Sequence, residues 1–390
     1  MKGSIRGKAD LAINGAPPAF DVPLHVGRPN IGNREAFMQR VARILDDRWL
    51  TNNGPVVQEF ERRLEKHLGV KHCVAMCNGT IALEVAIRAL GLEGEVIVPS
   101  WTFIATAHAL SWQGITPVFA DIDPDTHNLD PRSVRRMITQ HTTGIIGVHL
   151  WGRPAPIKEL QAIADEHGIQ LMFDAAHALG CSYKGRCVGN FGRCEVLSFH
   201  ATKVLNTFEG GALTTNDDEL AKTVRLMRNF GFSGYDNVIH LGTNAKMSEI
   251  NAAMGLINFD ELDNIISANL RNYEIYKDAL SDIPGIFLLQ HNSIERNNYH
   301  YVVAEVDEHI GVSRDEIISA LRAENVLARR YFWPGCHRMR PYCDLLQHTK
   351  FELSYTDEVA ERVVVLPNGA VLSPRSVEVI ARVCQIMVNG

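Results

Sequence analysis

The sequence lacks any apolar run that approaches the roughly 20 residues needed for a membrane-spanning helix. Residues 1–20 also contain no sustained apolar segment of the kind that signal peptides carry. Positive charge is not in excess, because 39 Lys and Arg residues face 45 Asp and Glu residues, a net charge of −6. This balance argues against general binding to the phosphate backbone of nucleic acids. These absences favour a cytoplasmic enzyme that binds neither a membrane nor a nucleic acid.

The cysteines also lack the pattern of a metal site. None of the eight forms a C-x-x-C pair, so the usual spacing of a zinc knuckle is missing. The looser group Cys181, Cys187 and Cys194 could ligate a metal together with His177. A free cysteine is more often a small buried hydrophobic residue, and cytoplasmic thiols stay reduced. We therefore expect no metal site.

Between residues 70 and 215, short apolar runs alternate with stretches of helical periodicity. The runs predict buried strands, because they are apolar or β-branched and are bounded by Gly, Pro or Asp. They are Cys73–Cys77, Glu95–Pro99, Pro117–Ala120, Gly144–His149, Leu171–Phe173 and Val196–Phe199. The predicted helices between them are Thr80–Leu90, Phe103–Trp112, Arg132–Thr139 and Ile157–His167. This alternation predicts an α/β fold with a mostly parallel sheet that helices cover on both faces.

The pattern changes near residue 250. A long helical stretch with one break is predicted from Met247 to Ala279, and shorter elements follow it. These are strand Tyr299–Val306, helix Arg314–Glu324, strand Val326–Tyr331 and helix Val377–Met387. We predict a large cofactor-binding domain over residues 51–255 and a smaller α+β domain over residues 256–390. Residues 1–50 are predicted to form an arm that packs on the smaller domain or on a partner chain.

Four short polar segments lie next to predicted strands or helices. Asn78-Gly79-Thr80 joins a strand to a helix, where backbone amides can hold a phosphate, although an ordinary N-cap is the alternative. Asp174 follows a strand at the end where α/β folds place ligands, although it could simply cap the next turn. Lys203 follows another strand, where burial can lower the pKa of the amine, although most lysines are solvated charges. The fourth, Gly242–Met247, is a polar loop that enters a helix.

Together, and in this order, the segments are typical of a pyridoxal phosphate site. The cofactor needs a lysine for a Schiff base, an acidic partner for the pyridine nitrogen and a cradle for its phosphate. Asp174 would keep the ring nitrogen protonated, so that the ring accepts the electrons released when a Cα proton leaves. The neutral amine of Lys203 would move that proton.

The sequence from Thr51 to about Gly390 resembles the DegT-type nucleotide-sugar aminotransferases, which belong to fold-type I of the pyridoxal phosphate enzymes. The matching stretches occur in the family's order and at approximately its spacing. They are NNGPVVQEFE (Asn52–Glu61), CNGTIALEVAIRALGL (Cys77–Leu92), PSWTFIATAHA (Pro99–Ala109), FDAAHALG (Phe173–Gly180), SFHATKVLNTFEGGA (Ser198–Ala212) and GTNAKMSEINAAMG (Gly242–Gly255). The resemblance implies a fold-type I aminotransferase that binds pyridoxal 5'-phosphate.

The resemblance also implies roles for individual residues. Lys203 would carry the cofactor as a Schiff base and shuttle protons, and Asp174 would pair with the pyridine nitrogen. Phe103 would stack on the face of the ring, a place for which Trp101 is the weaker candidate. His177 stands where many relatives carry Gln, beside the cofactor.

By the same resemblance, the cofactor phosphate is held by two chains of a homodimer with shared active sites. Gly79, Thr80 and Ser198 would hold it from one chain, and Asn244 would reach it from the neighbouring subunit. Lys246 replaces the more usual Arg of the family's N-x-R-M pattern, which affects a substrate or phosphate contact.

The type of reaction follows from the residue at position 203. Some members of the family are dehydratases that carry His there, so Lys203 favours transamination. The runs SFHATK and ARRYFWPGCH (Ala328–His337) are most similar to enzymes that aminate C4 of dTDP-4-keto-6-deoxyglucose. The resemblance therefore implies dTDP-4-amino-4,6-dideoxyglucose as the product and glutamate as the amino donor. The alternatives are a C3-aminating or GDP-sugar (perosamine-type) aminotransferase, another pyridoxal phosphate reaction, and a non-enzymatic regulator that retains the fold.

Overall fold

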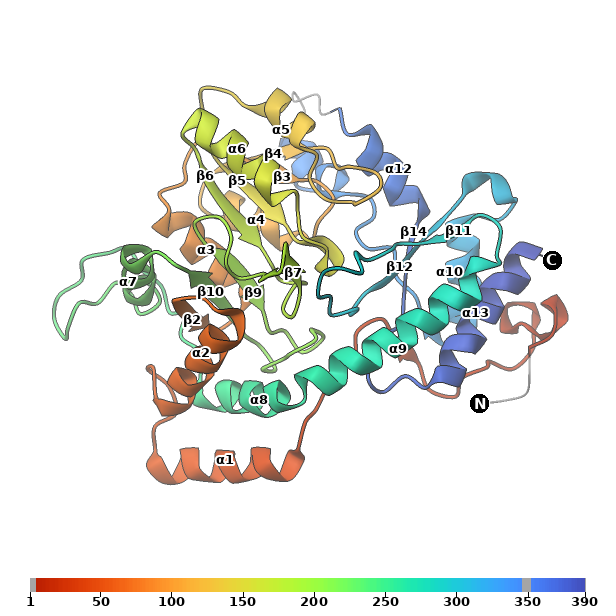
Figure 1. The fold of residues 1–390 in the computed structure, drawn as a ribbon, viewed down its shortest axis with the longest axis horizontal. Helices are drawn as coiled ribbons and strands as arrows, with labels where there is room; N and C mark the ends of the chain where they lie inside the picture. Colours follow the sequence, from red (N-terminus) through yellow and green to blue (C-terminus); the bar gives the residue numbers. More distant parts are fainter. Residues whose placement is uncertain (1–4, 346–351, 390) are drawn as a thin grey trace.

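The computed structural model describes residues 5–345 and 352–389, and a seven-stranded sheet lies at its centre (Figure 1). The strand order is β2 (His72–Met76), β10 (Gly211–Thr215), β9 (Glu195–Ser198), β6 (Gln170–Asp174), β5 (Thr142–Val148), β3 (Glu95–Pro99) and β4 (Thr116–Ala120). Strand β10 is antiparallel to both of its neighbours, and the other pairs are parallel. The predicted α/β class with a mostly parallel sheet is confirmed.

Helices cover both faces of this sheet, because successive residues of a strand point to opposite sides. Val96 and Val98 pack with α3 (Gly79–Ala89), α4 (Ala105–Ser111) and α7 (Asp218–Met227). Ile97, between them, packs on the other side with α5 (Pro131–Met137) and α6 (Ile157–His167). On that second side, α2 (Pro55–Leu68) and α8 (Glu249–Asp260) cover the end of the sheet near β2. Burial on both faces explains why the strand sequences are apolar without alternation.

The structure of this region differs from the predicted elements in several places. The helix predicted from Phe103 begins at Ala105, which leaves Phe103 in the loop after β3. Strand β10 and helix α7 are missing from the prediction altogether. Helix α7 has a clear start signal, since the Asp217 side chain accepts hydrogen bonds from the amides of Glu219 and Leu220.

The long helical stretch predicted from Met247 to Ala279 consists of two helices, α8 and α9 (Leu262–Ser281). The Ser248 hydroxyl caps the first by accepting a hydrogen bond from the Asn251 amide, and the break falls at Glu261. Helix α9 leads from the seven-stranded sheet to a second group of elements (Figure 1).

This second group is built on a three-stranded antiparallel sheet in the order β11 (Ile286–Leu288), β12 (Val302–Val306) and β14 (Val363–Leu366). The helices α9, α10 (Arg314–Ala323) and α13 (Pro374–Asn389) share one apolar core with it. Two shorter helices, α11 (Tyr342–Leu345) and α12 (Ser354–Arg362), precede β14. Strands β11 and β14 are missing from the sequence prediction, and the predicted strand Val326–Tyr331 shrinks to β13 (Val326–Leu327).

The N-terminal segment packs on this second group. Leu11, Ala19 and Phe20 enter its core, and β1 (Leu24–His25) pairs in parallel with β13. The Glu324 carboxylate accepts hydrogen bonds from the amides of Ala12 (2.6 Å) and Ala19 (2.7 Å). Helix α1 (Arg34–Asp47), which the sequence prediction lacks, lies alongside α8 (Figure 1).

The domain boundaries at residues 50 and 255 stay a prediction. Of the ranges assigned to the arm and to the small domain, residues 1–4, 346–351 and 390 lie outside the described residues. Within the described ranges, no helix combines the length and the apolar character needed to cross a lipid bilayer.

Candidate active site

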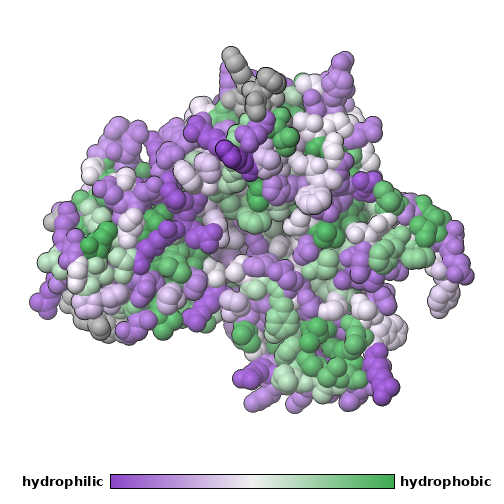
Figure 2. All heavy atoms as spheres, turned by 180° about the vertical axis from the view of Figure 1, so that it is seen from behind, coloured by the Kyte–Doolittle hydropathy of each residue, from purple (hydrophilic) through white to green (hydrophobic). Residues whose placement is uncertain are grey.

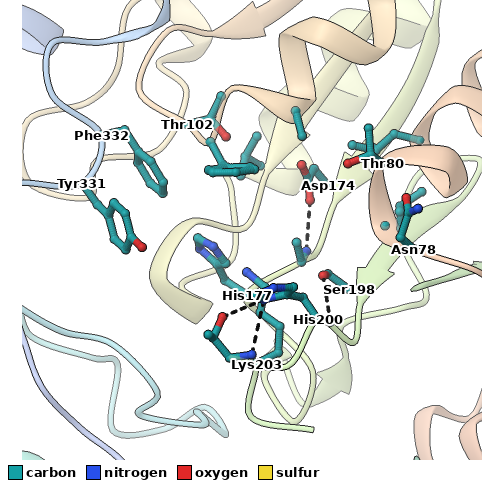
Figure 3. A pocket seen from close by; sticks show the side chains of 18 of the residues that line it. Asn78, Thr80, Thr102, Asp174, His177, Ser198, His200, Lys203, Tyr331 and Phe332 are labelled. Atoms are coloured by element: carbon teal, nitrogen blue, oxygen red, sulfur yellow. Dashed lines mark hydrogen bonds between the residues drawn. The ribbon is translucent and has the colours of Figure 1, made fainter. Parts of the chain in front are cut away.

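A cavity of about 430 Å³ lies where β2, β6 and β9 end (Figure 3). It brings together residues that are far apart in the sequence, because the carboxyl ends of parallel strands meet at one edge of a sheet. The predicted site residues that line it are Gly79, Thr80, Phe103, Asp174, His177, Ser198 and Lys203. Their individual roles stay predictions.

Asp174, the last residue of β6, is buried at the base of this cavity. Its Oδ1 accepts a hydrogen bond from the Ala176 amide (3.0 Å), and its Oδ2 accepts one from the Thr106 hydroxyl of α4 (2.8 Å). Burial raises the pKa of the Asp174 carboxyl, and these two bonds, together with the charge of Lys203, oppose that rise. The carboxylate is therefore held in a fixed place, where a cationic partner would offset its desolvation.

Lys203 lies in the loop after β9, on the other side of the cavity from Asp174 (Figure 3). Its Nζ lies 3.5 Å from the Tyr301 hydroxyl. Burial lowers the pKa of the Lys203 amine to about 8, although the Asp174 charge opposes the decrease. An appreciable fraction of this amine is therefore neutral near physiological pH, the form that acts as a nucleophile or base.

The segment Asn78-Gly79-Thr80 forms the start of α3. The Asn78 side chain caps the helix by accepting a hydrogen bond from the Ile81 amide (2.8 Å). The first amides of a helix have no carbonyl partner within it, so those of Gly79 and Thr80 can bind an anion. A Cβ atom on Gly79 would lie only 3.1 Å from Cβ of Ser198, so the glycine keeps this space open. The structure thus confirms the N-cap, and the phosphate cradle stays a prediction.

Aromatic side chains form the wall of the cavity opposite this cradle (Figure 3). Phe332 stacks on Trp151, with ring centroids 5.1 Å apart and an interplanar angle of 11°. His177 lies 4.5 Å from the Tyr301 ring, and its Nδ1 accepts a hydrogen bond from the Trp151 amide (3.4 Å). Burial lowers the pKa of His177 well below its ordinary value, so the ring is neutral.

The two aromatic candidates for stacking on the cofactor ring differ in position. Phe103 lines the cavity with 55% of its surface exposed. Trp101 is fully buried, packs against Phe332 and does not line the cavity. Of these two residues, Phe103 is the one that lines the cavity, and its stacking on the cofactor ring stays a prediction.

Asn244 stands apart from the cavity of its own chain. It is exposed, and its backbone forms an isolated bridge with Asn229. The neighbouring Lys246 donates a hydrogen bond to the Asn229 side chain (3.1 Å) and lies 4.6 Å from the centre of the Phe230 ring. This position is compatible with a contact to a second chain and offers no contact to the site in the same chain.

Several lining residues were missed from the sequence. Four of them come from the second group of elements: Tyr301, Arg329, Tyr331 and Phe332. They do not follow strands of the large sheet, so the position of strand ends in the sequence does not predict that they lie beside β6. Thr106, which holds Asp174, was also missed. Its signal is present in PSWTFIATAHA, since a hydroxyl on the first turn of a helix that follows a strand can reach the neighbouring strand end.

The sequence profile of the DegT/DnrJ/EryC1/StrS aminotransferase family matches residues 32–386. The chain belongs to this family. The predicted resemblance is thereby confirmed, and the protein is an aminotransferase.

Individual relatives agree with this assignment over nearly their whole length. Two proteins called dTDP-4-amino-4,6-dideoxy-D-glucose transaminase are similar to it. The one from Shigella dysenteriae is 37% identical and the alignment covers 93% of this chain and 98% of the relative. The one from Escherichia coli is 34% identical, and the alignment covers 95% of this chain and 99% of the relative. A crystal structure of DesI in the presence of its TDP-sugar product superposes with a TM-score of 0.92 at 48% identity, covering 97% of this chain and 96% of that one.

Proposed function

We propose that this aminotransferase uses pyridoxal 5'-phosphate to convert dTDP-4-keto-6-deoxyglucose into dTDP-4-amino-4,6-dideoxyglucose. The observation that carries the chemistry is one cavity in which a buried carboxylate, Asp174, faces Lys203, whose pKa burial lowers to about 8. The names of the two similar transaminases and of the DesI complex support the choice of sugar. Glutamate is the proposed amino donor, and the cytoplasm is the proposed location.

The residues of the cavity fit pyridoxal phosphate. The buried carboxylate of Asp174 suits a protonated pyridine nitrogen, and the amine of Lys203 suits the aldehyde carbon. The amides of Gly79 and Thr80, with the Ser198 hydroxyl, form the cradle for the phosphate, in space that a Cβ on Gly79 would fill. When bound, this cofactor supplies an electron sink conjugated to the reacting carbon of the substrate.

The chain's own groups position the substrate and move its proton. The neutral amine of Lys203 takes a proton from the reacting carbon of one substrate and delivers one to the other. Burial raises the pKa of Tyr301, so its phenol stays protonated 3.5 Å from this amine and fixes its direction. The stacked rings of Phe332 and Trp151 keep bulk water from that side of the cavity.

A panel of nucleotide-linked keto-sugars with glutamate tests this function. Mass spectrometry should detect amination of dTDP-4-keto-6-deoxyglucose, and NMR should place the new nitrogen on C4. A nitrogen on C3, or turnover of GDP-linked sugars alone, would replace the proposal by one of the two other aminotransferase types. Absence of product from every keto-sugar, with cofactor bound, would favour a regulator that retains the fold.

The active unit is proposed to be a homodimer in which each chain supplies Asn244 to the neighbour's cofactor phosphate. Exposed apolar side chains support association. Figure 2 shows hydrophobic surface over α1 at the bottom of the view and over the loop after α7 at its right edge. The exposed apolar residues there are Met38, Leu45, Trp49 and Leu50, and Phe230, Tyr235, Val238, Ile239 and Leu241. Such patches on a protein surface mark interaction sites, and the second patch is next to Asn244 in the sequence.

A further inference from the structure

Arg329 lies where three cavities meet. It lines the cavity that contains Lys203, a neighbouring one of about 470 Å³ that Tyr301 also lines, and a third of about 410 Å³ beside Phe103. Tyr331 lines all three as well, and the Arg329 guanidinium lies 4.5 Å from the centre of its ring. This one cation can therefore reach a ligand that extends from the reactive amine into either neighbouring cavity.

The other arginines around these cavities already have polar partners. The Arg322 guanidinium donates to the Ala328 carbonyl (3.2 Å), and Arg330 forms an ion pair with Asp315 (3.1 Å). In the described part of the chain, no carboxylate forms an ion pair with the Arg329 guanidinium, which lies over the ring of Tyr331. An unpaired guanidinium at the edge of an active site, in a protein of net charge −6, is a ready site for an anion.

At the 470 Å³ cavity, one nitrogen of a second polar side chain also lacks a partner among the described residues. His300 lines this cavity with 5% of its surface exposed, and among the described residues its Nδ1 has no hydrogen-bond partner. Buried polar atoms are normally satisfied, so an atom without a protein partner points to a ligand or water there. Burial lowers the pKa of His300 to about 4, so the ring is neutral and leaves the positive charge to Arg329.

We propose that Arg329 binds the anionic oxygens of a substrate, either the diphosphate of the sugar nucleotide or a carboxylate of the amino donor. Its planar fork of N–H donors matches both groups. The cofactor phosphate is a different anion, because its proposed cradle includes Thr80, which lies across the cavity from Tyr331 (Figure 3). The inference rests on the proposed function for the identity of the two substrates.

Binding of two unreactive probes to the holoenzyme tests the proposal. Inorganic pyrophosphate represents the diphosphate without nucleoside or sugar, and glutarate represents the amino donor without its amino group. Calorimetry would measure both affinities for the wild-type protein, Arg329→Gln and Arg329→Lys. Arg136→Gln is the matched control, since this exposed arginine on α5 lines none of the three cavities. Thermal melting and the visible absorbance of the cofactor would verify that each variant is folded and loaded.

Arg329→Gln should weaken binding of at least one probe by about tenfold or more, because a charge-assisted contact is lost. Arg329→Lys should keep part of the affinity, and Arg136→Gln should keep all of it. Weaker binding of pyrophosphate alone identifies the diphosphate as the ligand of Arg329, and weaker binding of glutarate alone identifies the carboxylate. Weaker binding of both probes means that the two substrates use Arg329 in turn. Unchanged affinity for both probes, or no binding of either by the wild type, would overturn the proposal. An incorrect choice of sugar would instead appear only in the product assay, since neither probe contains a sugar.

Discussion

Replacing Thr106 by valine removes one hydrogen bond from the carboxylate on which the proposed mechanism depends. The Thr106 hydroxyl is fully buried, donates to Oδ2 of Asp174 at 2.8 Å, and lies 3.1 Å from the Thr102 hydroxyl. Valine has nearly the same shape, so packing on α4 is kept while the donor is lost. A hydrogen bond to a charged group is worth about 1.5–3 kcal/mol. At 1.36 kcal/mol for each factor of ten, Thr106→Val should lower kcat/KM by about 10- to 150-fold.

The pH dependence gives this prediction a direction as well as a size. The Thr106 bond opposes the rise that burial causes in the pKa of Asp174, so its removal raises that pKa further. Asp174 is then protonated at a higher pH, and the acid limb of the kcat/KM profile should move upward. Because a raised carboxyl pKa costs stability only where the group is ionised, the loss of melting temperature in the apoprotein should be larger at pH 8 than at pH 5.

Two variants control for packing at this position. Thr106→Ser keeps the donor and should stay close to wild type in both profiles. Thr102→Val removes only the neighbouring hydroxyl and should have a smaller effect than Thr106→Val. If Thr106→Val retained kcat/KM within about twofold and an unshifted acid limb, Thr106 would have no part in holding Asp174 ionised.

Variants at three further residues test the proposed site. Lys203→Ala should lose turnover. Borohydride should fix the cofactor on Lys203 of the wild-type protein and label no residue of the Lys203→Ala protein. A label that mass spectrometry finds on another lysine would contradict the assignment. Asp174→Asn should fold but lose activity by about a hundredfold, because a neutral amide cannot stabilise a protonated pyridine nitrogen; near-normal kinetics would remove Asp174 from the mechanism. Asn244→Ala should release cofactor more readily on dilution, as measured by gel filtration with absorbance detection. Mixed dimers of Lys203→Ala and Asn244→Asp chains should regain some activity, since both lesions then fall in one site; no recovery after verified subunit exchange would argue against a shared site.

Local sequence was sufficient for the elements whose burial is continuous or periodic. The strand Glu95–Pro99 and the helix Ile157–His167 have the predicted bounds, because apolar character and end signals coincide there. Strand β10 was missed because its sequence Gly-Ala-Leu-Thr-Thr has little apolar character of its own. It is a strand because β2 and β9 supply hydrogen-bonding partners on both sides.

The sequence by itself determined the groups that make the chemistry possible. Asp174 ends one strand of the sheet, and Lys203 and the turn at Gly79 each follow another. They therefore come together because parallel strands end at one edge of a sheet. Only the tertiary structure decided the other half of the cavity. Tyr301, Arg329 and Phe332 reach it because β12 and the segment after β13 share an apolar cluster with Val148 at the end of β5. The lowered pKa of Lys203 is likewise a property of this enclosure, because desolvation depends on every atom that surrounds the amine, and those atoms come from distant parts of the chain.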